Sequence, residues 1–184
     1  MLYRIIDIVL ALLGLVLLAP ILLLVYLIGL FDTGSPLFLQ QRVGKHQQPF
    51  ILVKFRTMAL ETQSVATHLA DHQSVTRFGA FLRKSKLDEL PQLINVLKGE
   101  MSLVGPRPCL FNQNELVNLR QENGIFDVLP GITGLGQVEK VDMSTPKVLV
   151  SLEKKMLDEL SLSAYFRYIL QTVVGKGSGD RIKR

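Results

Sequence analysis

Residues 83–108 read RKSKLDELPQLINVLKGEMSLVGPRP, and this stretch decides how the middle of the chain folds. Leucine and isoleucine recur in it at helical spacing, and Gly99 is a natural helix terminator. Pro91 is tolerated only in the first turn of a helix, where backbone N–H groups have no partner within the helix. The pattern therefore predicts a helix within residues 85–98 that begins near residues 87–88.

Two acidic residues, Asp88 and Glu89, fall at the start of this predicted helix. Acidic side chains there commonly do no more than stabilise the helix dipole, by about 0.3–1 kcal/mol each. The surrounding charges favour a second interpretation, because a carboxylate among fixed cations stays ionised, as a nucleophile or metal ligand must. Arginine also matches phosphate oxygens two at a time, so the same cations suit a diphosphate. These cations are Lys54, Arg56, Arg83, Lys84, Lys86 and Arg107.

An apolar segment opens the chain. Residues 8–31 are 24 residues without a charge, and about 20 apolar residues cross a bilayer as a helix. A cleavable signal peptide has a shorter apolar region and a small-residue cleavage site, whereas residues 32–36 form a turn, so a retained anchor is favoured. Pro20 lies near the centre and kinks a helix there. The sequence alone favours a kinked spanning helix over a re-entrant hairpin with its apex at Pro20.

The rest of the chain is basic. One arginine and two aspartates lie in residues 1–32, which leaves 20 basic and 14 acidic residues in 33–184, a net charge of +6. This excess favours an anionic partner and places the main domain on the cytoplasmic side of the membrane. The basic residues lack interleaved aromatics, so no nucleic acid is expected as a partner. The single cysteine, Cys109, excludes an internal disulfide framework and fits a reducing compartment.

Several common catalytic sites are excluded by their motifs. The sequence has no glycine-rich loop followed by Lys-Ser/Thr, so a P-loop nucleotide site is not expected. It also has no Gly-x-Ser-x-Gly nucleophile elbow. His68 and His72 have helical spacing, but leucine follows His68 where zinc proteases carry glutamate, so no metal site is expected there.

Beyond residue 32 the pattern predicts one compact domain. The predicted strands are residues 37–41 and 49–55, and the further helices are residues 77–82, 112–123, 146–160 and 165–174. Residues 61–74 are predicted as a mobile loop and residues 176–184 as a frayed tail. Two Pro/Gly-rich stretches, residues 104–108 and 129–134, are expected to form rigid loops with exposed backbone donors, which suit anions.

A family resemblance is carried by the apolar start with its central proline and by four further stretches. These are QQRVG (residues 40–44), KFRTM (residues 54–58), the run at residues 83–108 and PGITGLGQV (residues 130–138). Together they resemble the bacterial sugar transferases, the monotopic phosphoglycosyl transferases that act on polyprenyl phosphate. The match extends from the N-terminus to about residue 140, and the long central run is highly specific.

This resemblance implies an α+β fold, mainly helical, with an N-terminal re-entrant membrane helix broken at Pro20. It thereby reverses the preference for a spanning helix. A compact cytoplasmic catalytic domain with membrane-surface amphipathic helices would follow. The expected boundaries are residues 1–32 for the anchor and 33–184 for the catalytic domain, as in the minimal form of the family. The implied location is the bacterial inner membrane, with the catalytic domain on its cytoplasmic face.

The resemblance also implies a ping-pong reaction. Asp88 would attack the β-phosphate of a UDP-sugar, release UMP and hold the sugar phosphate until undecaprenyl phosphate takes it, the first membrane step of a bacterial glycoconjugate pathway. Mg²⁺ is expected at Asp88, with Glu89 beside it as an acid/base or positioning group. Arg83 and Arg107 match phosphate-binding positions of the family. The full set of expected phosphate-binding residues is Lys54, Arg56, Arg83 and Arg107.

Two positions depart from the family pattern. Many relatives follow the Pro-Gly-x-Thr-Gly turn with Trp-Ala-Gln-Val-Asn-Gly-Arg, whereas residues 135–140 here read LGQVEK. A nucleotide or sugar contact from that region therefore cannot be carried over. Ala19 precedes Pro20 at a position where serine is common in relatives, so this chain has no serine hydroxyl there to assist at the kink.

A different class of function stays open: a non-catalytic, membrane-anchored basic protein that binds anionic lipid or a partner. An anchored nucleic-acid binder is a third option. The pair of acids among arginines favours the enzyme, because a lipid-binding surface gains nothing from carboxylates there. Membrane lipids are partners under the first two options, and a homo-oligomer is compatible with the sequence, which does not specify an oligomeric state.

Overall fold

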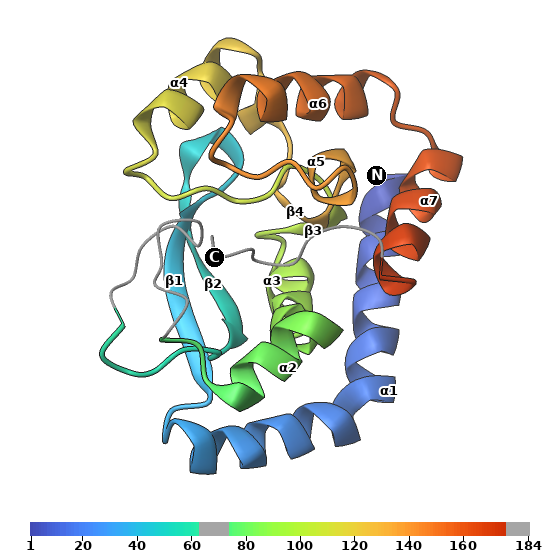
Figure 1. Ribbon diagram of the computed structural model, residues 1–184. Coiled ribbons are helices and arrows are strands. Elements are labelled where there is room, and N and C mark those ends of the chain that lie inside the picture. The colour runs from blue at the N-terminus through green and yellow to red at the C-terminus, as the bar shows by residue number, and fades with distance from the viewer. Residues whose placement is uncertain (63–73, 176–184) are drawn as a thin grey trace.

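A computed structural model describes residues 1–62 and 74–175 as a mainly helical α+β fold (Figure 1), which confirms the predicted class. The α-helices are α1 (Leu2–Asp32), α2 (Arg77–Ser85), α3 (Gln92–Lys98), α4 (Asn114–Glu122), α5 (Leu135–Val138), α6 (Pro146–Asp158) and α7 (Leu162–Val173). Short 3₁₀ turns are η1 (Lys45–Gln47), η4 (Leu87–Glu89) and η5 (Ile125–Asp127). The strands are β1 (Leu37–Val43), β2 (Pro49–Phe55), β3 (Ser102–Val104) and β4 (Gly131–Thr133).

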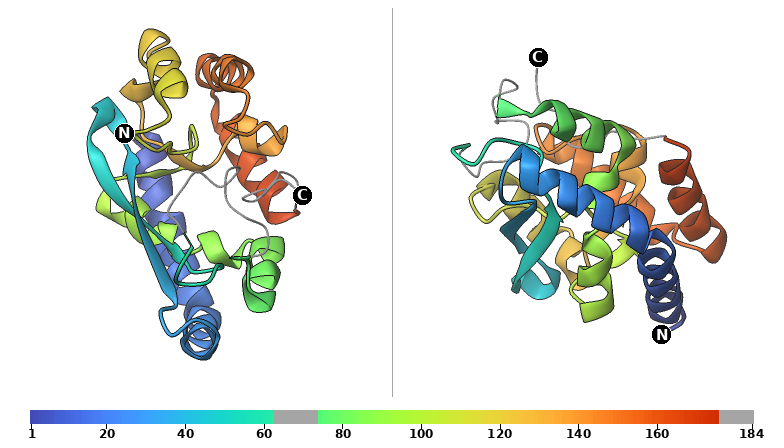
Figure 2. Two further views of the ribbon diagram at one scale, coloured as in Figure 1. Left: turned by 60° about the vertical axis from the view of Figure 1, so that its left-hand side comes forward. Right: turned by 90° about the horizontal axis from the view of Figure 1, so that it is seen from below.

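Helix α1 contains Pro20 and is, within the described part of the chain, the one helix long and apolar enough to cross a membrane. Its ribbon changes direction part-way along, and both Figure 1 and Figure 2 show two limbs that follow different edges of the molecule. A proline inside a helix removes one hydrogen bond and kinks it, which accounts for the bend. Helical structure nevertheless continues from Leu2 to Asp32. The break expected at Pro20 is therefore a bend within a continuous helix.

One face of α1 packs on the protein and the other is covered with exposed leucine, isoleucine and valine. Small or polar residues form much of the packed face, where Asp7, Ala11, Val25 and Gly29 are buried. Leu17 is the most exposed of these leucine, isoleucine and valine side chains, at 73%. Exposed large apolar side chains on this scale are unfavourable in water, and a lipid environment removes the penalty.

The described residues form two two-stranded sheets, and the sequence predicted the strands of only one of them. Strands β1 and β2, which were predicted, form an antiparallel hairpin in which Leu37 pairs with Phe55 and Val43 with Pro49. Strands β3 and β4 pair in parallel and were not predicted, since β4 lies within the predicted loop at residues 129–134 and β3 ends where the predicted loop at residues 104–108 begins. They were missed because three-residue strands have no readable alternation, and their pairing joins distant parts of the chain.

The largest hydrophobic cluster fills the space enclosed by the N-terminal limb of α1, helix α3, strand β3 and helix α7. Its buried members are Ala11, Phe50, Leu52, Leu93, Val96, Met101, Leu103, Val104, Met156, Ala164, Tyr165 and Tyr168. A second cluster lies between α4 and α6, and a third joins the C-terminal limb of α1 to β2 and α2. Both limbs of α1 therefore pack on the rest of the fold.

The predicted helix at residues 85–98 begins later than expected. Helix α2 ends at Ser85. Its C-cap, Lys86, has a left-handed backbone (φ 60°) that turns the chain into η4, and Pro91 occupies the N-cap of α3. Gly99 ends α3 in the left-handed conformation (φ 86°), as predicted. Asp88 and Glu89 thus lie in a tight 3₁₀ turn before α3 and not in its first turn.

The other predicted helices are found with shifted ends. Helices α4 and α6 lie inside the predicted ranges, whereas α2 ends three residues later and α7 begins three residues earlier than predicted. The predicted mobile loop falls largely on residues 63–73, and the predicted tail on residues 176–184. Both of these segments lie outside the described residues.

Candidate active site

An ion pair joins the acidic turn to the loop that follows β3. The Arg107 guanidinium donates to the Glu89 carboxylate across 2.6 Å, between Nη2 and Oε1. The side chains are 24% and 10% exposed, respectively, so this contact is partly shielded from water. A shielded arginine–carboxylate contact is stronger than an exposed one, because charge–charge attraction grows as the local dielectric constant falls.

Backbone hydrogen bonds fix the loop that carries Arg107. Gly105 N donates to Thr133 O across 2.8 Å, and Gly131 N donates to Pro106 O across 2.8 Å. The two glycines are so close that a Cβ atom on Gly131 would lie 2.0 Å from Gly105 N. The close approach of two Pro/Gly-rich stretches therefore requires glycine and holds Arg107 on a rigid base.

Asp88 is the most buried residue of the acidic turn. It is 2% exposed, compared with 8% for Glu89. The turn connects the C-terminus of α2 to α3 and packs against β2. Asp88 is therefore held by the protein on several sides, which is what a fixed nucleophile or metal ligand requires.

Lys86 belongs to the same group of charges. The sequence placed it among the cations near the acidic pair, but the expected phosphate-binding set did not include it. Burial lowers the pKa of Lys86, the Glu89 carboxylate raises it, and the nearby Arg107 guanidinium lowers it further. Its ammonium group donates to Thr172 O at the end of α7 across 3.3 Å. Its adjacency to the acidic pair was the available signal in the sequence, but side-chain direction in an unrecognised 3₁₀ turn could not be assigned.

Lys54 and Arg107 line one small cavity together with Arg42 and Gln92. Lys54 is 8% exposed, and its ammonium lies 5.6 Å from the centre of the Phe38 ring. Arg42 is also buried and donates to Pro108 O across 3.0 Å, next to the loop of Arg107. The alternation of β1, which turns residues 40 and 42 inward, is the sequence signal that could have identified Arg42.

The other two predicted phosphate-binding residues have separate partners. Arg83 donates from Nε to Thr57 Oγ1 across 2.8 Å. Arg56 donates from Nε to Ser35 O across 2.8 Å, where α1 leads into β1. The structure thus brings Lys54, Lys86, Glu89 and Arg107 into one neighbourhood, next to Asp88 in the chain, whereas the Arg56 guanidinium is engaged where α1 leads into β1.

The acidic turn suits one particular mode of metal binding. Within residues 1–62 and 74–175, no group of three His, Cys, Asp or Glu side chains is arranged to hold a metal. Mg²⁺, however, is commonly held by one or two carboxylates together with substrate phosphates and water. Asp88 beside Glu89 fits that mode of binding.

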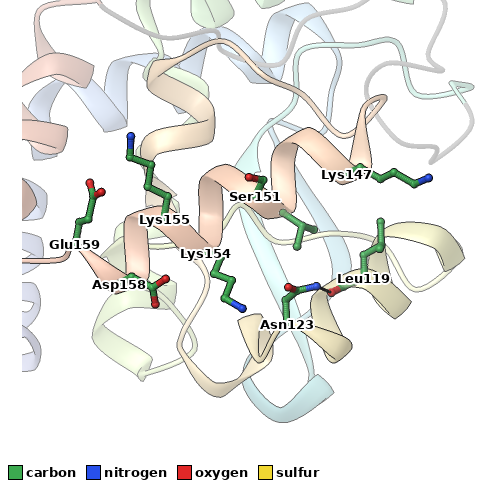
Figure 3. A pocket seen from close by; sticks show the side chains of 9 residues that line it. Leu119, Asn123, Lys147, Ser151, Lys154, Lys155, Asp158 and Glu159 are labelled. Carbon is green, nitrogen blue, oxygen red and sulfur yellow. Dashed lines mark hydrogen bonds between the residues drawn. The ribbon is translucent and has the colours of Figure 1, made fainter.

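The groove between α4 and α6, with a volume of about 450 Å³, lies apart from these residues (Figure 3). Its lining includes Leu119 and Asn123 on one side and Lys147, Ser151 and Lys154 of α6 on the other. None of the predicted site residues lines it. The candidate site therefore rests on the charged group around the acidic turn and not on this groove.

Comparison with known protein families bears on what this group of charges does. The model of the family described as "Bacterial sugar transferase" matches residues 1–176. The chain belongs to the bacterial sugar transferase family. The matched range includes α1, the acidic turn and both Pro/Gly-rich loops, so membership covers the whole candidate site.

Relatives of this bacterial sugar transferase include proteins with named reactions. The "Uncharacterized sugar transferase EpsL" of Bacillus subtilis is 49% identical over 57% of the chain and 52% of its own length. The "UDP-glucose:undecaprenyl-phosphate glucose-1-phosphate transferase" of Caulobacter vibrioides is 37% identical over 92% of the chain and 67% of its own length. The "Exopolysaccharide production protein ExoY" of Sinorhizobium fredii is 34% identical over 91% of the chain and 81% of its own length.

The length of the relatives varies widely. The chain spans about half of EpsL and about a third of two longer sugar transferases. The bacterial sugar transferase region is thus found both in longer proteins and in relatives close to this size.

Proposed function

We propose that this bacterial sugar transferase moves a sugar 1-phosphate from a UDP-sugar to undecaprenyl phosphate and releases UMP. The observation that carries the proposal is the shielded contact of Arg107 with Glu89, directly beside the buried Asp88. A carboxylate fixed next to a guanidinium group suits attack on a phosphate, because the cation neutralises charge on the phosphate oxygens. The names of relatives that act on undecaprenyl phosphate support this substrate class.

In the proposed reaction, an Asp88 oxygen attacks the β-phosphorus of the donor. The bond from that phosphorus to the bridging oxygen breaks, UMP leaves with the bridging oxygen, and the sugar phosphate stays on Asp88. A phosphate oxygen of undecaprenyl phosphate then attacks the same phosphorus and restores the Asp88 carboxylate. Such ping-pong transfer splits one difficult step into two easier ones.

The neighbouring residues would perform different tasks in this scheme. Arg107 would bind the phosphate oxygens, and Glu89 would orient Arg107 through their ion pair while acting as the acid/base beside Asp88. Lys54 lines the cavity next to Arg107 and adds positive charge behind it. Arg83 and Arg56 complete the proposed phosphate-binding set. Mg²⁺ bound at Asp88 would neutralise the charge of the transferring group.

The arrangement of α1 supports a re-entrant anchor. A straight helix of 31 residues would extend about 46 Å, well beyond the roughly 30 Å core of a bilayer. Near its N-terminus, Arg4 donates to Val96 O across 2.6 Å, and at its C-terminus Asp32 accepts from Thr76 Oγ1 across 2.7 Å. Both ends thus contact the same domain, whereas a spanning helix would separate them. We place that domain on the cytoplasmic face because of its positive charge.

Helix α7 would contribute a second surface for lipid. Its exposed apolar residues recur at helical spacing and form one stripe, which consists of Leu162, Phe166, Leu170 and Val173. The helix lies beside the N-terminal limb of α1 (Figure 1), and the rings of Tyr3 and Tyr165 stack between them at 5.1 Å. This geometry suits a helix that lies on the membrane surface.

The decisive experiment measures UMP release by the purified protein in detergent with Mg²⁺, undecaprenyl phosphate and a panel of UDP-sugars. Asp88→Asn should abolish release. Asp127→Asn is the matched control, because Asp127 also lies in a 3₁₀ turn but its side chain is 77% exposed. Near-normal turnover by Asp88→Asn would exclude Asp88 as the nucleophile.

Intact-mass spectrometry after reaction with donor alone should show an added sugar phosphate. An unmodified mass together with normal transfer would instead indicate direct transfer from donor to acceptor. Binding to anionic vesicles without UMP release from any donor would favour the non-catalytic lipid-binding alternative.

A further inference from the structure

Asp7 is a buried carboxylate on the otherwise apolar helix α1. It is 2% exposed. Leu103 N donates to its Oδ1 across 2.8 Å and Ser102 Oγ across 3.2 Å, and the hydroxyl of Tyr165 donates to the same oxygen. A buried charge is strongly unfavourable unless it is well hydrogen-bonded. An ionisable group in a membrane helix that carries this many specific partners calls for a functional explanation.

The Tyr165 hydroxyl remains a hydrogen-bond donor at neutral pH. Burial raises the pKa of Tyr165, and its hydrogen bond to Asp7 raises the pKa further. The Tyr165 ring also stacks on Tyr3, four residues before Asp7. Helix α7 therefore fixes Asp7 from one side while strand β3 fixes it from the other.

Strand β3 connects Asp7 to the candidate active site. Two of the Asp7 partners, Ser102 and Leu103, are the first residues of the strand. The strand leads directly into Gly105, whose backbone is paired with Thr133, and two residues later the chain reaches Arg107. Because this segment is short and held by hydrogen bonds, a shift of Leu103 relative to α1 is transmitted to Arg107 and its contact with Glu89.

Arg4 gives a second, independent connection one turn earlier on α1. Its guanidinium donates to Val96 O across 2.6 Å and to Leu97 O across 3.1 Å, at the C-terminal end of α3. A cation there stabilises the helix end. Helix α3 directly follows the turn that contains Asp88. The first two turns of α1 therefore hold both the strand before Arg107 and the helix after Asp88.

We propose that Asp7 is a positioning residue for sugar-phosphate transfer, which fixes strand β3, and through it Arg107, against the membrane helix. The proposal rests on the proposed function. It assigns to the anchor a part in the geometry of the active site, because the helix that sets the depth of the protein in the membrane also sets the place of Arg107.

A double-mutant cycle distinguishes this role from a contribution to folding alone. If Asp7 acts through Arg107, Asp7→Asn should lower kcat/KM roughly tenfold in the wild-type background, since small misplacements of a binding group slow transfer strongly. In the Arg107→Ala background the same change should cost less than about twofold. A role in folding alone predicts equal losses in both backgrounds, and that result would overturn the proposal.

The controls use residues of the same helix and the same contact. Asp32→Asn removes an equal charge from α1 at an exposed hydrogen bond and should leave kcat/KM within about twofold of wild type. Tyr165→Phe removes one donor to Asp7 but keeps the stacked ring. Tyr165→Phe should fold normally and should lower kcat/KM, as Asp7→Asn does. If kcat/KM is unchanged both in Tyr165→Phe and in folded Asp7→Asn, the proposal is refuted.

Hydrogen–deuterium exchange reads the same coupling without any substrate. Amides of residues 102–105 and 107 should exchange faster in Asp7→Asn, whereas Asp32→Asn should exchange like wild type. Unchanged exchange at these amides in Asp7→Asn would overturn the proposal. If the wild-type protein releases no UMP from any donor while exchange at these amides rises as expected, the proposed function fails and the Asp7–β3 coupling stands.

Discussion

Arg120 and Glu153 form a two-point ion pair that joins α4 to α6 inside the protein. Arg120 Nη2 lies 2.5 Å from Glu153 Oε1, and Nε lies 2.9 Å from Oε2, with both side chains 2% exposed. Burial lowers the pKa of the Arg120 guanidinium, but the Glu153 carboxylate and the nearby Cys109 both raise it, and the net effect is a raised pKa. Helices α4 and α6 are thus held together by a buried ion pair within an apolar cluster.

Removing one partner of this pair should destabilise the fold severely. Glu153→Gln leaves the buried Arg120 guanidinium without its counter-charge, and we expect the free energy of unfolding to fall by about 3–5 kcal/mol. Chemical denaturation in detergent micelles measures this change. The exposed Glu115→Gln on α4 serves as the control and should stay within about 0.5 kcal/mol of wild type. A loss equal to that of the control would show that the pair is dispensable.

Substitutions at Arg107 test the ion pair of the candidate site. Arg107→Lys keeps the charge but loses the planar fork that binds Glu89 and phosphate together, so kcat/KM for transfer should fall by roughly 10²-fold. Steady-state kinetics with varied donor provides the measurement. Arg77→Lys, an exposed arginine at the start of α2, should behave like wild type. Equal activity of the two variants would remove Arg107 from the phosphate-binding set.

The thiol of Cys109 should be inert in the native protein. Burial raises the pKa of Cys109, with smaller opposing contributions from Arg120. The folded thiol therefore stays protonated as the pH rises through its ordinary range, whereas the unfolded chain ionises there and reacts. Ellman's reagent at about pH 8 should modify the single cysteine slowly in the native state and rapidly in denaturant. Rapid native labelling would contradict the packing between α4 and α6.

Gly79→Ala should displace the helix that carries Arg83. A Cβ atom at Gly79 would lie 2.1 Å from the backbone oxygen of Thr57, which cannot move aside. We expect a loss of stability of about 1–3 kcal/mol or more, together with reduced transfer. Gly14→Ala is the matched control, because there the new methyl would meet only the flexible end of Leu93 at 3.1 Å. Thermal unfolding measures the stability of both variants. Equal melting temperatures for Gly79→Ala and Gly14→Ala would contradict this prediction.

Local patterns in the sequence were sufficient for part of this structure. The strands at residues 37–41 and 49–55 and the end of α3 at Gly99 were predicted, because these features depend on neighbouring residues alone. The long apolar segment likewise predicted α1. Pro91 was read correctly as a limit on the helix, but Lys86 in a left-handed conformation introduced a 3₁₀ turn that periodicity does not reveal.

Long-range pairing set the boundary of what the sequence could predict. The parallel pairing of β3 with β4 joins segments 29 residues apart, as Ser102 and Gly131 show. The contact of Asp7 with Leu103 spans 96 residues and turns an acid of the anchor helix into part of the core. Of the candidate site, the acidic pair and Arg107 were identified from sequence as charged neighbours, and the structure adds the contact between Glu89 and Arg107.

The seating of both ends of α1 on one domain has a practical consequence for making soluble versions of this protein. Deleting residues 1–32 would remove Asp7, Ala11 and Val25 from the interior and expose the surfaces they cover. A variant designed for crystallisation or screening should instead keep the helix and replace only outward-facing leucines, such as Leu17, with polar residues. In this protein helix α1 is part of the packed interior, so it cannot be removed or replaced without disturbing the rest of the fold.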